Sequence, residues 1–416
     1  MTNNFTEVDI QIQQGLEEVD FTAPGKLVLA EIERSQAARD ITEVSHWKRA
    51  HYKAVMNWLT KYKPKPDATN LEKVRGLLEA FHHLCEVEAW EKASSILFTP
   101  LNTPTNEELH NQLALWGYYR AQADLYHRLL DKFDSRLKLL FLNGLGNSYH
   151  ALSNYTKAIE YHKQALTLAR ENKYRRGEGQ ALNNLGNAYL SLGKYIKAIE
   201  SYQQSLAIAL EIPNRQLEAT ALGNLGSAYR FIGAYYQAID YHQQSLSIAL
   251  EIPDRQGEGV AQGNLGFTYF TIGNYAKAIE QSEQYLIISQ EIQDRQGEEN
   301  ALGNLGIAYR SIGEYDNATK YYKLSLKIAR EIGDCYGEGN ALSNLGNVYA
   351  FFGNYDEAIK YQQQSLAIAQ KIGNCKGESI ALGNLGIAYA SKKDYVKALG
   401  YQQQGLLMAR EIQDRQ

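Results

Sequence analysis

From Asp134 to its end, the sequence repeats every 40 residues without an insertion or a deletion. The tripeptide Asn-Leu-Gly marks this period and begins at Asn184, Asn224, Asn264, Asn304, Asn344 and Asn384. A period between about 20 and 50 residues is typical of a solenoid, in which each unit buries its apolar face only against its neighbours. We therefore expect residues 134–416 to form seven such units, 134–173, 174–213, 214–253, 254–293, 294–333, 334–373 and 374–413.

Each unit has the pattern of two helices. In unit 254–293, Ala261, Leu265 and Tyr269 recur at a spacing of four, which is typical of the apolar stripe of an amphipathic helix. Gly273 follows at a position where a left-handed residue ends a helix, and a second apolar helical run comes after it. The repeat therefore predicts an all-α fold of antiparallel helical hairpins.

Capping residues indicate where the first helix of each unit begins. Aspartate or asparagine can accept hydrogen bonds from the free N–H groups of a helix start. Such a residue opens every unit except the one that begins at Tyr174: Asp134, Asn214, Asp254, Asp294, Asp334 and Asn374.

A second glycine column lies in the middle of the first helix, at Gly146, Gly186, Gly226, Gly266, Gly306, Gly346 and Gly386. Glycine costs about 1 kcal/mol against alanine inside a helix, so close packing must offset it. We expect these glycines to face the alanine column of the second helix, Ala158, Ala198, Ala238, Ala278, Ala318, Ala358 and Ala398. A larger residue at position 306 is then expected to destabilise its unit.

Arginine and glutamate recur three residues apart at the start of the first helix, at Arg175/Glu178, Arg215/Glu218, Arg255/Glu258 and Arg295/Glu298. Residues at this spacing lie on one face of a helix, so we expect surface ion pairs that support the helix.

Composition excludes several classes of partner. The formal net charge is −4 and the isoelectric point is near 6.2, with both signs mixed along the chain. This balance predicts neither a nucleic acid partner nor an anionic membrane surface. The chain begins without a signal segment, and no run of about 18 apolar residues could cross a bilayer, so a soluble cytoplasmic protein is expected.

The sequence offers no motif for catalysis, metals or cofactors. It contains no His-Glu-x-x-His and no Gly-x-Ser-x-Gly, and its three cysteines include no Cys-x-x-Cys pair. The stretch from Ala23 to Leu27 approaches a phosphate-binding loop but lacks its first glycine and its final serine or threonine. We therefore expect no enzyme activity, no cofactor and no metal.

The motifs Leu-Gly-x-x-Tyr in the first helix and Gly-x-Tyr-x-x-Ala-Ile at the start of the second resemble the tetratricopeptide repeat. The unit length and the phrase from Asp254 to Gly259 look most like the longer repeats of Partner-of-Inscuteable-type scaffolds and of kinesin light chain, here in a bacterial-type protein. The resemblance covers 134–416 and implies a right-handed superhelix that serves as a non-catalytic binding scaffold.

The residues before the regular repeats are more divergent. Residues 34–133 look like helices and decayed copies of the unit, with Trp90 standing where a tyrosine usually opens the second helix. Residues 1–33 show no sustained period, and we expect them to be mobile. The divergent residues 34–133 also loosely resemble the helical segment that precedes repeat arrays in bacterial signal-transduction ATPases of the regulated-oligomerisation type.

The family resemblance places the first helix on the concave surface, where the residue before Leu-Gly contacts peptides. Here that residue is the asparagine at 184, 224, 264, 304, 344 and 384. An amide offers both a donor and an acceptor, which suits an extended peptide backbone. The alternative is that these amides bond to neighbouring repeats.

Variable columns on the same helix would select side chains of the ligand. Arg230 and Arg310 could bind carboxylates, while Phe267 and Phe270 could hold an apolar anchor, so we expect an acidic and partly hydrophobic peptide. The alternative is that the arginines are solvated.

Two functions agree with these patterns. The first is an adaptor that binds an extended or helical peptide in its concave groove. The second is a sensor or regulatory arm of a signalling switch whose catalytic part is on another chain or absent. Asp414, Arg415 and Gln416 begin an eighth unit and leave an apolar face uncapped, which predicts self-association or a continuation.

Overall fold

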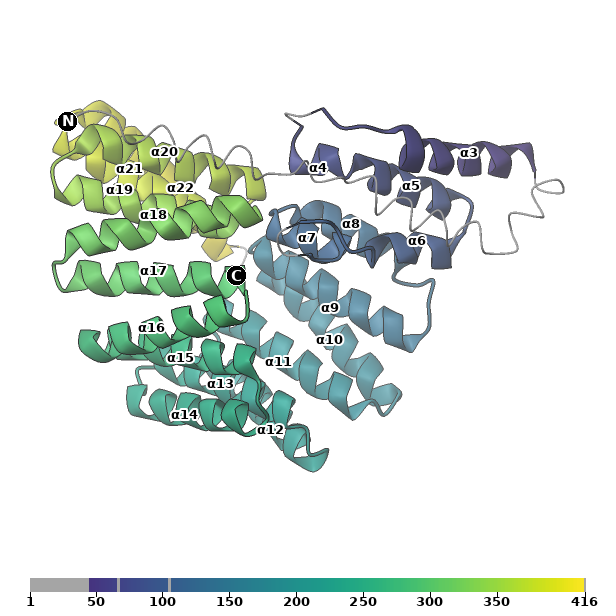
Figure 1. The fold of residues 1–416 in the computed structure, drawn as a ribbon, viewed down its shortest axis with the longest axis horizontal. Helices are drawn as coiled ribbons and strands as arrows, with labels where there is room; N and C mark the ends of the chain where they lie inside the picture. The colour runs from purple at the N-terminus through teal and green to yellow at the C-terminus, as the bar shows by residue number, and fades with distance from the viewer. Residues whose placement is uncertain (1–44, 66–67, 104–105, 415–416) are drawn as a thin grey trace. The chain divides into compact units, whose positions relative to one another are not determined.

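The computed structural model describes residues 45–65, 68–103 and 106–414. These residues contain twenty helices and no strand, and they form two compact units that divide after Leu113. The predicted all-α solenoid of helical hairpins is confirmed (Figure 1). The segment 1–33, expected to be mobile, lies outside the described residues.

The first unit holds short helices, and a further helix crosses its boundary. In chain order the helices are α3 (His46–Lys61), α4 (Asn70–Lys73), α5 (Arg75–Glu86), α6 (Trp90–Leu97) and α7 (Leu109–Leu115). Helix α6 begins at Trp90, as the repeat pattern predicts. That residues 34–133 are divergent copies of the repeat stays a prediction.

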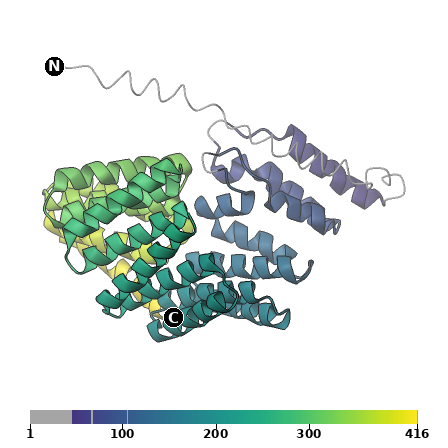
Figure 2. The same cartoon turned by 60° about the horizontal axis from the view of Figure 1, so that its bottom comes forward.

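The second unit continues with α8 (Tyr119–Leu129) and then seven hairpins, which Figure 2 shows stacked side by side. Their helices pair as α9 (Ser135–Ala151) with α10 (Tyr155–Glu171), α11 (Arg175–Ser191) with α12 (Tyr195–Glu211), α13 (Arg215–Phe231) with α14 (Tyr235–Glu251), α15 (Arg255–Thr271) with α16 (Tyr275–Glu291), α17 (Arg295–Ser311) with α18 (Tyr315–Ile332), α19 (Cys335–Phe351) with α20 (Tyr355–Ile372), and α21 (Cys375–Ser391) with α22 (Tyr395–Asp414). The core runs between neighbouring hairpins; for example, Leu142 of α9 packs in one cluster with Leu182 of α11 and Ile208 of α12.

The predicted helix starts and turns are confirmed. Each of the six predicted aspartate or asparagine caps accepts a backbone N–H bond from the first turn of its helix, whereas Tyr174 makes no such bond. Gly273 has a φ of 79°, and the same turn in the first and last hairpins forces Ser153 and Lys393 to φ values of 58° and 63°. Non-glycine residues in this left-handed region are strained.

The expectation that the helical glycines face the alanine column is wrong for most hairpins. A Cβ atom at Gly186 would lie 2.4 Å from the ring of Tyr202, and one at Gly306 would lie 2.5 Å from the ring of Tyr322. Each of these glycines therefore leaves space for a larger side chain of the second helix, one turn after the alanine. These side chains are His162, Tyr202, His242, Tyr322, Gln362 and Gln402. Gly266 is closer to the prediction, because its Cβ would meet the Ser282 hydroxyl and the Ala278 carbonyl.

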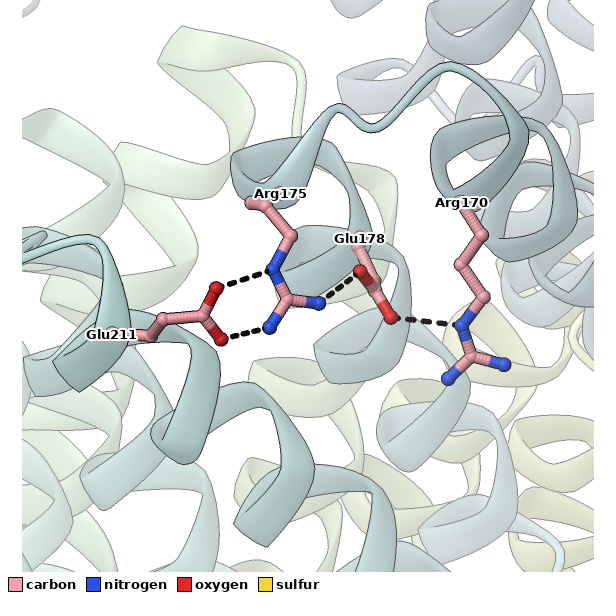
Figure 3. Close-up of polar contacts among 4 residues, drawn as sticks. All are labelled: Arg170, Arg175, Glu178 and Glu211. Carbon is pink, nitrogen blue, oxygen red and sulfur yellow. Dashed lines mark hydrogen bonds and ion pairs between the residues drawn. The ribbon is translucent and has the colours of Figure 1, made fainter.

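The recurring arginine–glutamate pairs belong to larger hydrogen-bond networks, one of which is drawn in Figure 3. Arg175 Nη1 donates to Glu178 Oε2 at 2.5 Å, and its Nε donates to Glu211 Oε1 of the next helix at 3.0 Å. Arg170 Nε of the preceding hairpin donates to the other oxygen of Glu178 at 2.8 Å. Burial alone would raise the pKa of Glu178, but the bonds from Arg170 and Arg175 lower it below its ordinary value. The network thus joins three helices.

A buried carboxyl group occupies a column that holds glycine, alanine or serine in five of the other six hairpins. Glu299 of α17 is 5% exposed, and its Oε1 accepts a hydrogen bond from Ser325 Oγ at 2.7 Å. A Cβ atom at Gly337 of the next hairpin would lie 3.0 Å from the Glu299 carboxyl carbon. Burial and, to a smaller extent, the nearby Asp334 raise the pKa of Glu299 to about 7, although the hydrogen bond from Ser325 acts to lower it.

We predict that alanine substitution of two glycines in α17 has opposite effects on stability. Gly306→Ala should lower the free energy of unfolding by about 1–3 kcal/mol, because the new methyl group overlaps the buried Tyr322 ring. Gly303→Ala is the matched control, because nothing lies within 4 Å of its Cβ position, and it should gain about 0.5–1 kcal/mol. Urea unfolding measures both, and equal losses would contradict the packing role of Gly306.

We also predict that Glu299 lowers the free energy of unfolding, and that this effect depends on pH. Its folded pKa of about 7 lies above the ordinary value of 4.5, so the folded state holds a proton that the unfolded chain releases between these pH values. The contribution of the protonated Glu299 to the free energy of unfolding is fully present below pH 4.5 and is lost as the pH rises through 7. Glu299→Gln should match the wild type near pH 4.5 and exceed it by up to about 3 kcal/mol at pH 8. A difference between the two proteins that does not change with pH would contradict this.

Candidate functional site

The first helices of the hairpins form one continuous face of the second unit. Helices α9, α11, α13, α15, α17, α19 and α21 contact their successors in this series, whereas the second helices of successive hairpins approach one another less. The array therefore curves toward its first helices, and we call their shared surface the inner face. All six predicted asparagines lie on these helices and are half-buried.

The six asparagines at 184, 224, 264, 304, 344 and 384, which we call the asparagine ladder, divide into two groups of three. Asn184 Nδ2 donates to Asn143 Oδ1 at 3.2 Å, Asn224 Nδ2 donates to Asn183 Oδ1 at 3.5 Å, and Asn384 Nδ2 donates to Ser343 Oγ at 3.3 Å. Each partner lies 41 positions earlier, in the preceding hairpin. These three asparagines therefore form hydrogen bonds to the neighbouring repeat, which was the alternative to ligand contact.

Asn264, Asn304 and Asn344 have no such partner. The residues 41 positions before them are Gly223, Gly263 and Gly303, which have no side chain to bond. Among the hydrogen bonds of the described residues, none involves these three amide groups. Three adjacent hairpins thus present donors and acceptors to solvent on the inner face, and that they contact a ligand stays a prediction.

A cavity of about 250 Å³ opens beside two of these unpaired amides. Asn264 and Asn304 line it together with Val260, Gly263, Phe267, Tyr285, Asn300 and Arg230. A Cβ atom at Gly263 would lie 2.8 Å from the Tyr285 ring, so glycine is needed where this large side chain enters the hairpin. The cavity combines amide, aromatic, aliphatic and cationic groups.

Arg230 brings an uncompensated charge to this cavity. Its guanidinium carbon lies 4.5 Å from the ring centre of Phe267 and 4.7 Å from that of Phe231. No ion pair of the described residues involves Arg230. Burial lowers the pKa of its guanidinium, but the ordinary pKa of arginine is so high that the group stays charged near neutral pH. A planar cation held between two rings has its N–H donors free for a carboxylate.

The other predicted side chains lie outside this cavity. Phe270 packs against Phe267 and Tyr275, with ring centres 5.9 Å and 5.8 Å apart. Arg310 is half-buried near the end of α17, and no ion pair of the described helices involves it. The structure therefore gathers Arg230, Phe267, Asn264 and Asn304, and it does not bring the remaining predicted residues to the same place.

Sequence reasoning missed Val260, Gly263, Tyr285 and Asn300. A signal for one of them was present: Tyr285 is the one aromatic residue in a column that otherwise holds Ser205, Ser245, Ser325 and Ser365 in neighbouring hairpins. Its ring occupies the space left by the absent side chain of Gly263, a glycine that recurs at Gly223, Gly303 and Gly383.

Other kinds of site find no support in the part of the chain that the structure describes. That part contains no group of three or more histidine, cysteine, aspartate or glutamate side chains that could hold a metal ion. None of its helices is long and apolar enough to span a membrane.

Comparison with known proteins identifies the repeat. The family model of the tetratricopeptide repeat matches residues 138–211, 217–291, 261–331, 297–371 and 337–411. No curated protein matches the sequence.

Several solved structures share the fold. A Rap protein complexed with competence and sporulation factor is 14% identical, with a TM-score of 0.58 over 90% of this chain and 100% of that one. The Rap conjugation gene regulator of the plasmid pLS20, in complex with the Phr* peptide, is 16% identical, with a TM-score of 0.57 over 82% of this chain and 96% of that one. A signal transduction ATPase from Pyrococcus horikoshii with a tetratricopeptide repeat sensor is 17% identical, with a TM-score of 0.50 over 89% of this chain and 54% of that one. At these identities the likeness concerns the fold alone.

The two groups of asparagines should differ in their effect on stability. Asn184→Ala removes a hydrogen bond between hairpins and should lower the free energy of unfolding by about 0.5–1.5 kcal/mol. Asn304→Ala removes an amide without a partner and should leave stability nearly unchanged. Chemical denaturation of the two variants provides the test, and an equal loss would mean that Asn304 has a structural partner after all.

Proposed function

Because the chain belongs to the tetratricopeptide repeat family, we propose that it is a protein-interaction adaptor or sensor that binds an extended peptide on the inner face of α13, α15, α17 and α19. The observation that carries this proposal is the set of three unpaired amides, Asn264, Asn304 and Asn344, of which the first two line a cavity with an uncompensated cation. Polar groups without partners on a half-buried surface are costly unless a ligand or water satisfies them.

The unpaired amides suit the backbone of a peptide. Successive residues of an extended chain present N–H and C=O groups in alternation, and each asparagine can both donate and accept. Backbone contacts of this kind are independent of the ligand's side chains, so they provide affinity without selecting a sequence. Selection must come from the cavity.

The cavity favours a peptide that carries an apolar and an acidic side chain close together. Val260 and Phe267 offer an apolar wall, while Arg230 offers a charge that a carboxylate would neutralise. The structurally similar Rap regulator was solved with the Phr* peptide, which supports a peptide as the class of ligand. We propose a non-catalytic, cytoplasmic role of this kind.

One structural neighbour favours a second function. The ATPase from Pyrococcus horikoshii carries a tetratricopeptide repeat sensor, and this chain spans 54% of that protein. An array of the present type could therefore be the sensor arm of a signalling switch whose catalytic part is elsewhere. In both functions the inner face recognises the ligand.

The test is a selection of peptides from a random displayed library, followed by affinity measurements on matched variants. We expect the selected peptides to share an acidic and an apolar residue at a fixed spacing. The triple variant Asn264→Ala, Asn304→Ala, Asn344→Ala should weaken their binding at least about tenfold, since each lost bond is worth about 0.5–1.5 kcal/mol.

The matched control is the triple variant of the paired asparagines, Asn184→Ala, Asn224→Ala, Asn384→Ala. It removes the same number of amides and should retain binding at temperatures where it stays folded. Peptides that bind both triple variants as tightly as the wild type would exclude the unpaired amides as the binding surface. Failure to select any peptide would count against peptide binding itself.

A further inference from the structure

Two segments of the second unit that are far apart in sequence meet in the structure. The Cys335 thiol, at the start of α19, donates a hydrogen bond to the Trp116 carbonyl at 3.2 Å, across 219 positions of the chain. A Cβ atom at Gly117 would lie 2.5 Å from Ile372 Cγ2, at the end of α20. The turn before α8 therefore packs against one corner of the sixth hairpin, α19–α20.

Several neighbouring side chains take part in this contact. Lys371 Nζ lies 5.9 Å from the ring centre of Tyr118. Burial, together with the nearby Asp334, Cys335 and Tyr336, raises the pKa of Tyr119 to about 12.

A second point of approach lies beside the first. A Cβ atom at Gly373 would come within 3.4 Å of Leu152 Cδ2, in the turn after α9. The corner of α19–α20 thus meets residues on both sides of the start of the repeat array. A chance touch of one side chain would not produce this set of approaches.

The sequence departs from the repeat at the same corner. In the four preceding hairpins, an arginine at the start of the first helix pairs with a glutamate at the end of the second: Arg175/Glu211, Arg215/Glu251, Arg255/Glu291 and Arg295/Glu331. In the sixth hairpin these positions hold Cys335 and Lys371. Of the seven hairpins, this is the one in which both residues of the pair are replaced.

Both replacements favour the contact. A cysteine is short enough for its sulfur to reach the Trp116 carbonyl, whereas an arginine there would place a long cation against the turn. Lysine supplies a positive charge near the Tyr118 ring, where the usual glutamate would place a negative charge against the π electrons. The ion pair is absent at the hairpin where it would obstruct packing.

We propose that the surface formed by Cys335, Lys371 and Ile372 is an intramolecular docking site for the turn at 116–119. This latch holds the array at a closed turn and thereby sets the curvature of the inner face. The unpaired amides at 264 and 304 lie on hairpins that stand between the two segments in the chain, and Asn344 lies on the sixth hairpin itself. A ligand that prefers one curvature would shift the latch between its closed and open states.

The first test uses a disulfide as a reporter of closure. The Cβ position of residue 117 lies 3.4 Å from the Cβ of Cys335, close to the range of about 3.5–4.5 Å found in disulfides. Because a Cβ atom at residue 117 would also meet Ile372, the cysteines are tested in the Ile372→Ala background, which removes Cγ2 of Ile372. In that background Gly117→Cys should form an intramolecular disulfide with Cys335 under mild oxidation, identified by peptide mapping. Gly193→Cys is the matched control, because Gly193 also has a positive φ, 72° against 77°, but has nothing within 4 Å.

Closure would be excluded if position 117 formed no disulfide faster than the control, or if it joined only separate molecules. A second measurement covers the case in which the strained cysteine variant does not fold. Gly117→Ala should clash with Ile372 and open the latch, whereas Gly313→Ala carries a similar backbone strain without a neighbour to meet. Small-angle X-ray scattering should give a larger radius of gyration for the Gly117 variant.

The alkylation rates of the two natural cysteines, Cys335 and Cys375, offer an internal comparison in the Gly117→Ala variant. Opening the latch should expose Cys335 and raise its rate of alkylation several-fold, while Cys375, the equivalent residue of the next hairpin, should react at an unchanged rate. If neither the radius of gyration nor the rate at Cys335 changes in Gly117→Ala, the contact does not hold the array closed.

Discussion

Each hairpin of this protein can bury its apolar face only against the hairpins before and after it. The spacing between hairpins therefore has to be the same throughout the array, and the unbroken 40-residue period reflects that requirement. Inside six of the seven hairpins, the helical glycine leaves space for one larger side chain of the second helix, such as Tyr202 or Tyr322. This packing sets how the two helices lie against each other, and all surface features depend on it.

The surface features that distinguish individual hairpins arise at columns whose residue type varies from hairpin to hairpin. Glycine in place of asparagine or serine leaves the amides of Asn264, Asn304 and Asn344 without partners, while the pair Gly263 and Tyr285 shapes a cavity beside them. Cys335 and Lys371 replace an ion pair where a distant turn packs. Because the backbone repeats, such changes alter the surface of one hairpin and leave the fold unchanged.

Some residues could be assigned from the sequence and others could not. The helix caps and the left-handed turns depend on a few adjacent residues, so their positions follow from local pattern. The neighbours of Gly306 could not be predicted, because Ala318 and Tyr322 lie one helical turn apart and the sequence does not give the rotation of one helix against the other. The ladder was predicted as one set, but Asn184 and Asn304 differ through residues 41 positions away.

The sequence by itself determined the all-α hairpin architecture and its period, because these follow from spacing along one chain. The tertiary structure decided which amides lack a partner, which residues enclose the cavity around Phe267, and that Trp116 meets Cys335. These properties depend on distances between side chains of different hairpins. Such distances arise from the accumulated rotation of hairpin upon hairpin, and no local pattern encodes that sum.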